Sequence, residues 1–241
     1  MTAPAHEDPL EECARQVMQP GRVVTWLNHY SLLNADWEQL ARVDLVGIDG
    51  TLLQMALARA GHSIERSSAD LVAPHVFRLL DKGAKIALIG AGPGVALKAA
   101  ERLGDFETMC IDGYEGLAQL RADPGQLIAF DPRLVIVGLG AGLQDRIAVG
   151  VRAWLPRASV MTAGGWIDQF AAAEQYFPAW IHRFRLGWAW RIAHEPRRLI
   201  GRYTVDALRF VVEGSALVAR LESMGSPTPL GVRITSGSSG A

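Results

Sequence analysis

Six arginines fall within twenty positions in the C-terminal part of the chain, and aromatic side chains lie between them. A cationic segment with aromatic anchors can bind phosphate through guanidinium groups, lie on an anionic membrane surface or bind nucleic acid. A structural helix with solvated arginines is the fourth possibility. The segment contains Trp180, Arg183, Phe184, Arg185, Trp188, Trp190, Arg191, Arg197, Arg198 and Arg202.

Polar residues also follow several apolar, β-branched runs, at the points where strands are expected to end. Asp49, Gln144 and Asp168 each follow such a run, and Gly140 lies in the same loop as Gln144. Because ligands of open α/β sheets bind outside the carboxyl ends of the strands, we expect these residues to converge. Asp49 would suit a general base, a sugar-hydroxyl partner or a metal ligand. An Asp-Gly turn is the structural alternative.

A glycine-rich loop, with Gly90, Gly92 and Gly94 at alternate positions, follows another of these runs. Glycines after a strand let backbone N–H groups and a helix N-terminus approach a phosphate. Asp112 lies 22 positions after Gly90, where nucleotide-binding folds place a ribose partner. Val95 occupies the third glycine position of the dinucleotide pattern, so a tight turn without a ligand is equally compatible.

The composition restricts the class of partner. A formal net charge of −1 over 241 residues makes the basic segment a local feature, so we expect no nucleic-acid partner. Cys13 and Cys110 lack metal-ligand spacing, which indicates reduced thiols in a cytoplasmic protein. The histidines show no ligand spacing and no Asp-x-Asp sequence occurs, so we expect no metal and no cofactor.

The N-terminal residues are acidic and polar, which is not the pattern of a signal peptide. The sequence contains no run of about 18 apolar residues, so no membrane span is predicted. The hydrophobic content of 49% suffices for one large α/β domain.

Strand-like runs alternate with helical stretches, which predicts βαβ units and a parallel sheet. We therefore predict an α/β fold, a Rossmann-like parallel sheet with helices on both faces and a C-terminal Arg/Trp-rich helical segment. The expected strands are 23–27, 45–48, 85–90, 108–111, 134–139 and 159–162. One helix is expected to start near residue 31, and another to run from the glycine-rich loop to residue 103. Further helices are expected at 52–60, 69–80, 146–154, 169–176 and 205–221. The last is expected to be amphipathic, with apolar positions 205, 208, 212 and 218.

These elements suggest one folded unit between two tails. Residues 1–20 are predicted to be a flexible N-terminal tail, and 21–176 a Rossmann-like catalytic domain. Residues 177–224 form the C-terminal helical segment of the same domain, and 225–241 a flexible tail rich in Gly and Ser.

In this order and spacing, the motifs resemble the WecG/TagA/CpsF family of bacterial glycosyltransferases, glycosyltransferase family 26. The resemblance covers about residues 23–203. It is carried by Thr25-Trp-Leu-Asn28, Val46-Gly-Ile-Asp49-Gly50, Arg66 with Ser68-Ala-Asp70-Leu71, the run 87–94, Asp112-Gly-Tyr114, the run 137–140 with Gln144, the run 164–168, Pro178-x-Trp180, Leu186-x-Trp188, Arg191, Glu195-Pro-x-Arg198 and Arg202-Tyr203.

The resemblance implies an inverting, metal-independent enzyme of cell-surface polysaccharide synthesis. Such an enzyme moves a sugar from a UDP-sugar to a polyprenyl-diphosphate-linked acceptor at the inner face of the cytoplasmic membrane. A homo-oligomer is compatible with the resemblance. Asp49 is the implied general base, with Asn28 and Arg66 beside it. The implied donor-binding residues are Gly90, Gly92, Gly94, Asp112, Gly140, Gln144, Asp168, Arg191, Arg198 and Arg202. The residues expected to contact the membrane are Trp180, Arg183, Phe184 and Arg185.

Three motifs depart from the family pattern. The chain has Gly142-Leu143-Gln144-Asp145 for Pro-Lys-Gln-Glu, Tyr176-Phe177-Pro178 for Arg-Ala-Pro, and Leu186-Gly187-Trp188 for Leu-Glu-Trp. A diverged enzyme with another sugar or acceptor is one alternative, and a membrane-bound partner protein without activity is another. An enzyme that binds S-adenosylmethionine or NAD through the glycine-rich loop is the alternative from a different class.

Overall fold

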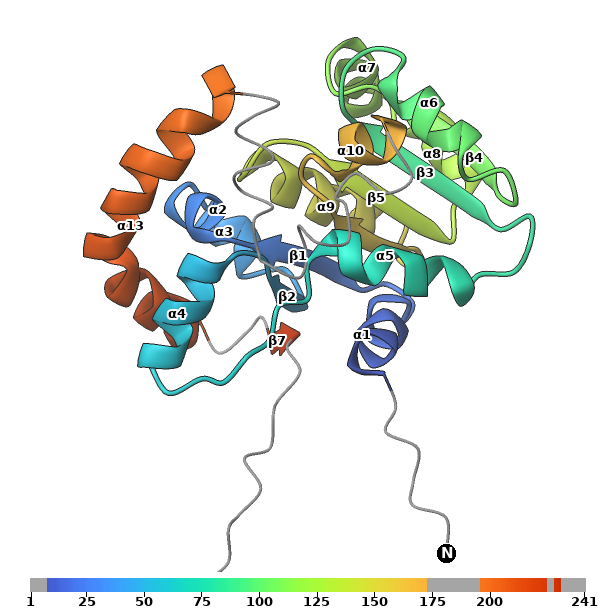
Figure 1. The fold of residues 1–241 in the computed structure, drawn as a ribbon. Coiled ribbons are helices and arrows are strands. Elements are labelled where there is room, and N and C mark those ends of the chain that lie inside the picture. The colour runs from blue at the N-terminus through green and yellow to red at the C-terminus, as the bar shows by residue number, and fades with distance from the viewer. Residues whose placement is uncertain (1–7, 173–195, 225–227, 231–241) are drawn as a thin grey trace, which may run out of the picture.

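The computed structural model describes residues 8–172, 196–224 and 228–230. At its centre lies a parallel sheet with helices on both faces, which confirms the α/β, Rossmann-like fold (Figure 1). Within the described residues the sheet has seven strands in the order β4-β3-β5-β6-β1-β2-β7. They are β1 Val23–Leu27, β2 Leu45–Ile48, β3 Lys85–Gly90, β4 Glu107–Ile111, β5 Leu134–Gly138, β6 Ser159–Thr162 and β7 Thr228–Leu230.

The strand order changes direction at two places, which creates openings at the carboxyl edge. β3 has β4 on one side and β5 on the other, and both pairs are parallel. β1 likewise lies between β2 and β6, again in parallel. Loops that leave neighbouring strands toward opposite faces separate at such points, so a crevice forms there.

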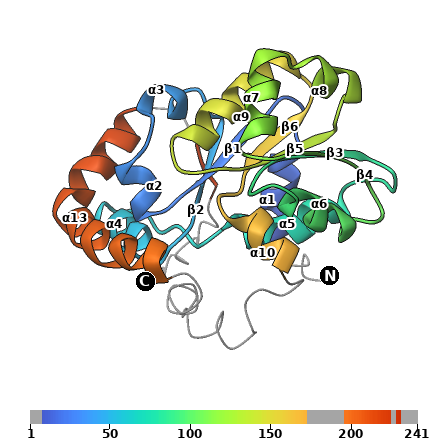
Figure 2. The same ribbon diagram turned by 90° about the horizontal axis from the view of Figure 1, so that it is seen from above.

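The helices of the described residues form three groups (Figures 1 and 2). One face of the sheet is covered by α1 Pro9–Val17, α5 Ala69–Arg78, α6 Val95–Glu101 and α10 Trp166–Ala172. The other face is covered by α7 Glu115–Ala122, α8 Gly125–Phe130 and α9 Leu143–Trp154. The end formed by β1 and β2 is covered by α2 His29–Leu33, α3 Trp37–Leu40, α4 Thr51–Arg59 and α13 Pro196–Ser223.

Alternating side chains of the central strands fill both layers of the core. In β3, Ile86 and Leu88 pack with α1, α5 and α6, whereas Ala87 and Ile89 pack with α7 and α9. All four are fully buried. Burial of each large aliphatic side chain stabilises the fold by about 1.5–3 kcal/mol, so the register that positions the strand ends is firmly held.

Helix α13 is longer than the predicted 205–221 and buries a different face. Phe210, Val218 and Leu221 are buried, and the Phe210 ring meets the His29 ring of α2 edge-on at 6.1 Å. Of the apolar positions expected to face the core, 205, 208 and 212 are exposed and only 218 is buried. The prediction was wrong because an apolar stripe lies on each side of this helix, and the bulky Phe210 belongs to the inward one.

The predicted flexible tail 1–20 is corrected by helix α1. The Asp8 side chain caps its first turn by accepting from the N–H of Leu10, and a proline occupies the first turn. Cys13, Ala14 and Val17 are buried against α5 and the sheet. An amphipathic, capped segment of this kind folds onto the core despite its position at the chain end.

The predicted tail 225–241 is corrected in part, because residues 228–230 form β7 and pair in parallel with β2. Of the predicted C-terminal helical segment 177–224, α13 covers 196–223, and residues 177–195 lie outside the described residues. None of the described helices is both long enough and apolar enough to cross a membrane.

Candidate active site

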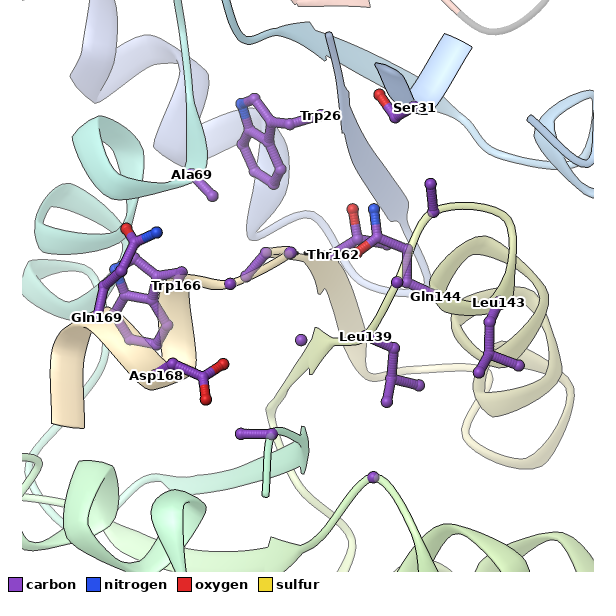
Figure 3. Close-up of a pocket in the computed structure, with 18 of the residues that line it drawn as sticks. Trp26, Ser31, Ala69, Leu139, Leu143, Gln144, Thr162, Trp166, Asp168 and Gln169 are labelled. Atoms are coloured by element: carbon purple, nitrogen blue, oxygen red, sulfur yellow. Dashed lines mark hydrogen bonds between the residues drawn. The ribbon is translucent and has the colours of Figure 1, made fainter. Parts of the chain in front are cut away.

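A cavity of about 730 Å³ lies along the carboxyl ends of strands β1 to β6 (Figure 3). Every one of these strands contributes the residues that follow it, so the predicted convergence of the strand ends is confirmed. The expected site residues in its lining are Asn28, Asp49, Gly92, Gly140, Gln144 and Asp168. A cavity of this size has room for a ligand as large as a nucleotide sugar.

Asp49 stands at the cavity immediately after β2. Its backbone N–H donates to the carbonyl of Leu27 at 2.7 Å, which extends the pairing of β1 and β2 by one residue. Arg66 Nε donates to Asp49 Oδ1 at 3.2 Å, and Arg66 Nη2 lies 3.6 Å from Asp70 Oδ1. One guanidinium thus bridges two carboxylates of the lining and restricts the orientation of Asp49.

The turn after Asp49 explains the glycine that follows. Gly50 has φ of +102°, a conformation that L side chains rarely adopt, and it precedes the first residue of α4. The Asp-Gly turn expected from the sequence therefore exists, and it directs the carboxylate to the cavity as well. The structural and functional interpretations of this dipeptide are compatible.

Asn28 is fixed by the start of helix α2. Its Oδ1 accepts from the N–H of Ser31 at 3.0 Å, and Ser31 Oγ accepts from the N–H of Asn28 at 2.7 Å. This reciprocal pair is a capping box, which orients the side chain at low entropic cost. Because Oδ1 is engaged in the cap, the amide NH₂ is the part of Asn28 suited to donate to a ligand.

A buried hydroxyl network lies beneath the cavity floor. Thr25 Oγ1 donates to Asp145 Oδ1 at 2.6 Å and lies 2.7 Å from Thr162 Oγ1. All three residues are buried, and Thr162 also lines the cavity. Burial raises the pKa of the Asp145 carboxyl above its usual value, against the opposing effect of the Thr25 hydrogen bond.

Gln144 joins two of the loops that form the cavity. Its Oε1 accepts from the N–H of Gly164 at 3.1 Å, which ties the first turn of α9, reached from β5, to the loop after β6. Gln144 is itself buried, and Figure 3 shows its amide close to Thr162. The residue therefore contributes to the shape of the site, whatever it contacts in a ligand.

The predicted glycine loop divides into structural and lining positions. Gly90 has φ of +133°, and a Cβ atom there would collide with the carbonyl of Gly138 on β5. Gly94 has φ of +76° and precedes α6, where a Cβ would meet nothing within 4 Å. Neither lines the cavity, whereas Gly92 and Gly140 do.

Asp112 has a structural use. Its Oδ1 accepts from the N–H of Tyr114 at 2.8 Å and its Oδ2 from the N–H of Gly116 at 3.1 Å, at the start of α7. It is absent from the lining, in which Gly113 and the largely exposed Tyr114 appear instead. Asp112, the residue expected to bind a nucleotide ribose, therefore has both carboxylate oxygens engaged by backbone N–H groups.

The arginine-rich segment is described only in part. Arg198 and Arg202 belong to α13 by their backbone. Arg191 and the expected membrane contacts lie outside the described residues; these contacts are Trp180, Arg183, Phe184 and Arg185.

Sequence reasoning did not select several lining residues. Asp206 enters the cavity from α13, and Trp26 and Asp70 enter from β1 and α5. The Trp26 indole N–H donates to the carbonyl of Ser67. Asp206 shares a helix face with Phe210, four positions later, but the sequence alone does not show that this face is the buried one.

Two rims of the cavity differ in chemistry. The glycine rim consists of Gly92, Gly113 and Gly140, after β3, β4 and β5. The acidic rim consists of Asp49, Asp70 and Asp206, at the side of β1 and β2. Asp70 Oδ2 is buried and has no hydrogen-bond partner among the described residues. No group of three or more potential metal ligands occurs in the described part of the chain.

A parallel sheet with a cavity at its carboxyl edge is the arrangement of Rossmann-like folds, which bind their ligands at that edge. The model of the glycosyl transferase WecG/TagA/CpsF family matches residues 2–224, and the chain belongs to this family. It is therefore a glycosyltransferase by family.

Relatives with known activities are similar over much of the chain. A UDP-Gal:alpha-D-GlcNAc-diphosphoundecaprenol beta-1,4-galactosyltransferase of Shigella boydii is 26% identical over 79% of this chain and 86% of its own length. An N-acetylglucosaminyldiphosphoundecaprenol N-acetyl-beta-D-mannosaminyltransferase of Bacillus spizizenii is 26% identical over 66% of this chain and 64% of its own length. The enzyme of the same name from Bacillus subtilis is 29% identical over 48% of this chain and 47% of its own length.

Proposed function

We propose that the protein transfers a hexose or N-acetylhexosamine from a UDP-sugar to a polyprenyl-diphosphate-linked saccharide, with inversion and without a metal. The observation that carries the proposal is Asp49, a carboxylate oriented by Arg66 at the edge of the cavity. The names of the relatives, with their undecaprenyl-diphosphate acceptors and β-linked products, support it. The biological setting is the synthesis of bacterial cell-surface polysaccharide.

In the proposed reaction, Asp49 accepts the proton of an acceptor hydroxyl as that oxygen attacks C1 of the donor sugar. The bond between C1 and the diphosphate oxygen breaks, and UDP leaves with the electron pair. Attack from the face opposite UDP turns an α-linked donor into a β-linked product. Arg66 holds the base in the attacking geometry, and the amide of Asn28 donates to the sugar substrates.

The diphosphate is proposed to bind at the glycine rim, where residues without side chains allow a ligand to approach the main chain closely. Side-chain cations would stabilise the leaving UDP in place of a metal. Arg198 and Arg202, in the first two turns of α13, are proposed for this role, as the family resemblance implies. Arg191 is proposed to join them.

Membrane contact is proposed to involve the exposed stripe of α13 as well as the aromatic and basic residues at 180–185. Val205, Leu208, Val211 and Val212 are between 63% and 83% exposed. Apolar side chains on a surface helix bind the interface of a bilayer, and basic residues add attraction to anionic lipid. A lipid-linked acceptor requires the enzyme to reach that surface.

The activity test combines the purified protein with UDP-galactose or UDP-N-acetylmannosamine and N-acetylglucosaminyl-diphosphoundecaprenol. We expect a β-linked disaccharide, identified by NMR, and turnover that persists in EDTA. Strict dependence on Mn²⁺ or Mg²⁺ would contradict metal independence. Calorimetric titration with UDP, S-adenosylmethionine and NAD should show binding of UDP alone. UDP binding without turnover on any acceptor would favour the alternative of a diverged family member that lacks this activity.

The membrane test measures co-sedimentation with anionic vesicles. Replacing Leu208 and Val212 by Asp should reduce vesicle binding several-fold, because two apolar contacts are lost and two negative charges are added. Leu97→Asp on α6 is the matched control, since Leu97 is a similarly exposed aliphatic residue on another helix. Equal losses in both variants would contradict a specific role for α13.

A further inference from the structure

Asp206 is a carboxylate on the inward face of an otherwise apolar helix surface. Phe210 and Gly214, four and eight positions later, are buried on that face, and Phe210 contacts the His29 ring of α2. The face begins in the core of the β1–β2 end and extends to the cavity, where Asp206 joins the lining. Asp206 therefore puts a charged side chain on this apolar face, at the point where α13 meets the cavity.

The nearby basic residue of α13 is engaged elsewhere. Arg209 Nε donates to Glu213 at 2.8 Å, on the same helix. No hydrogen bond or ion pair of the described side chains involves Asp206; Arg209 interacts mainly with Glu213, and the charge of Asp206 acts on it more weakly. An ionised carboxylate accepts hydrogen bonds only, so the ligand groups that suit it are donors such as hydroxyls.

The position of Asp206 separates two classes of ligand group. It lies on the acidic rim with Asp49 and Asp70, at the β1–β2 side of the sheet. The glycine rim lies after β3, β4 and β5, on the far side of β6 and β1 in the strand order. Like charges at short range repel, so a diphosphate is disfavoured beside these carboxylates, whereas sugar hydroxyls are favoured.

We propose that Asp206 accepts a hydrogen bond from a hydroxyl of the acceptor saccharide and thereby contributes to the choice of that saccharide. The inference rests on the proposed function, in which Asp49 on the same rim takes the proton of the acceptor. It adds a specificity-determining residue supplied by α13. A site built to bind a hydroxyl discriminates strongly against an analogue that lacks it.

Binding measurements test the assignment without requiring turnover. The probes are UDP and a short-chain prenyl-diphospho-N-acetylglucosamine, titrated into wild type, Asp206→Ala and Asp206→Asn. Asp206→Ala should weaken acceptor binding about tenfold or more and leave the UDP affinity within about twofold. Glu213→Gln, a carboxylate-to-amide change two turns along the same helix, is the control and should alter neither affinity.

Monodeoxy acceptor analogues separate recognition from a structural effect. In wild type, removal of one particular hydroxyl should weaken binding strongly, and in Asp206→Ala that same removal should have little further effect. The penalties at the other hydroxyls should be the same in both proteins. If every hydroxyl carries the same penalty in wild type and variant, Asp206 does not recognise the saccharide and the inference is overturned.

The outcomes also distinguish this inference from the proposed function. A wild-type protein that binds neither UDP nor the acceptor analogue would contradict both. Normal binding of both probes by wild type and by Asp206→Ala would overturn the inference alone. A loss of UDP affinity in Asp206→Ala, with acceptor binding retained, would place Asp206 with the donor and overturn it too.

Discussion

The glycine rim and the acidic rim of the cavity use their residues in opposite ways. At the glycine rim, Asp112 is engaged in hydrogen bonds to the backbone, and Gly92, Gly113 and Gly140 present only main chain to the cavity. At the acidic rim, three carboxylates line the cavity and Arg66 bridges Asp49 and Asp70. Recognition by main chain depends on close approach, whereas recognition by carboxylates depends on charge and orientation.

This difference predicts how each rim responds to substitution. A change at the glycine rim should alter shape and thereby fold or donor affinity. A change at the acidic rim should alter chemistry and leave the fold intact, because its carboxylates contribute little to the hydrophobic core. The following substitutions test the comparison.

Asp49→Asn should have the largest effect. The amide keeps the shape of the side chain but cannot take a proton, so turnover should fall about 10²–10⁴-fold. UDP affinity should change little, because the diphosphate is assigned to the other rim. Steady-state kinetics and calorimetric titration measure the two quantities, and wild-type turnover in the variant would remove Asp49 from the role of base.

Gly90→Ala should instead lower stability, by about 3 kcal/mol. The new Cβ collides with the Gly138 carbonyl, and φ of +133° is unfavourable for alanine. Urea unfolding followed by circular dichroism measures the change. Gly104→Ala serves as the control, because its Cβ would approach only the Glu101 carbonyl oxygen, at 3.8 Å. A Gly90→Ala protein as stable as wild type would show that β3 and β5 can separate.

The contrast between Gly90 and Gly92 shows where sequence reasoning succeeds and where it stops. Hydrophobic periodicity and the turn residues between the runs predicted six of the seven described strands, because buried parallel strands have a strong local signature. They could not separate a glycine required for strand packing from one that borders the cavity. That distinction depends on the distance between β3 and β5, which is a property of the assembled sheet.

Helix α13 shows a second limit. Its sequence has apolar residues around most of its circumference, so periodicity alone could not choose the buried face. The choice depends on Phe210 fitting beside His29, a contact between segments far apart in the chain. The same packing of α13 brings Asp206 to the cavity, and because the sequence did not reveal that packing, Asp206 was not among the expected site residues.

Gly92→Ala should have a moderate effect that is confined to the donor. A Cβ there would meet only the Val95 side chain at 3.6 Å, an ordinary contact, so the fold should be retained. The methyl group would nevertheless stand between the backbone and a bound diphosphate. UDP affinity should fall roughly tenfold, about 1.4 kcal/mol, as measured by calorimetry. Unchanged UDP affinity would indicate that the diphosphate binds away from this rim.

Asp145→Asn should have the smallest effect and should appear mainly in the pH dependence of stability. Burial raises the pKa of Asp145 in the folded protein above its unfolded value, so the folded state binds this proton more tightly. Its contribution to stability is present below the unfolded pKa and is lost as pH rises through the folded pKa. The asparagine cannot ionise and can still accept from the Thr25 hydroxyl at 2.6 Å.

The stability of Asp145→Asn relative to wild type should therefore increase as pH rises above about 4, the ordinary pKa of an aspartate. Urea unfolding of both proteins between pH 4 and pH 8 measures this difference. Glu12, whose pKa is lowered, produces the opposite trend but titrates equally in both proteins, so its contribution cancels. The nearby charge of Asp36 helps to raise the pKa of Asp145, after burial as the main cause, and is therefore part of the measured difference. A difference that stays constant with pH would mean that Asp145 is ionised beneath the cavity. The acidic rim would then stand above a fourth negative charge, and its preference for hydroxyl donors over a diphosphate would be stronger still.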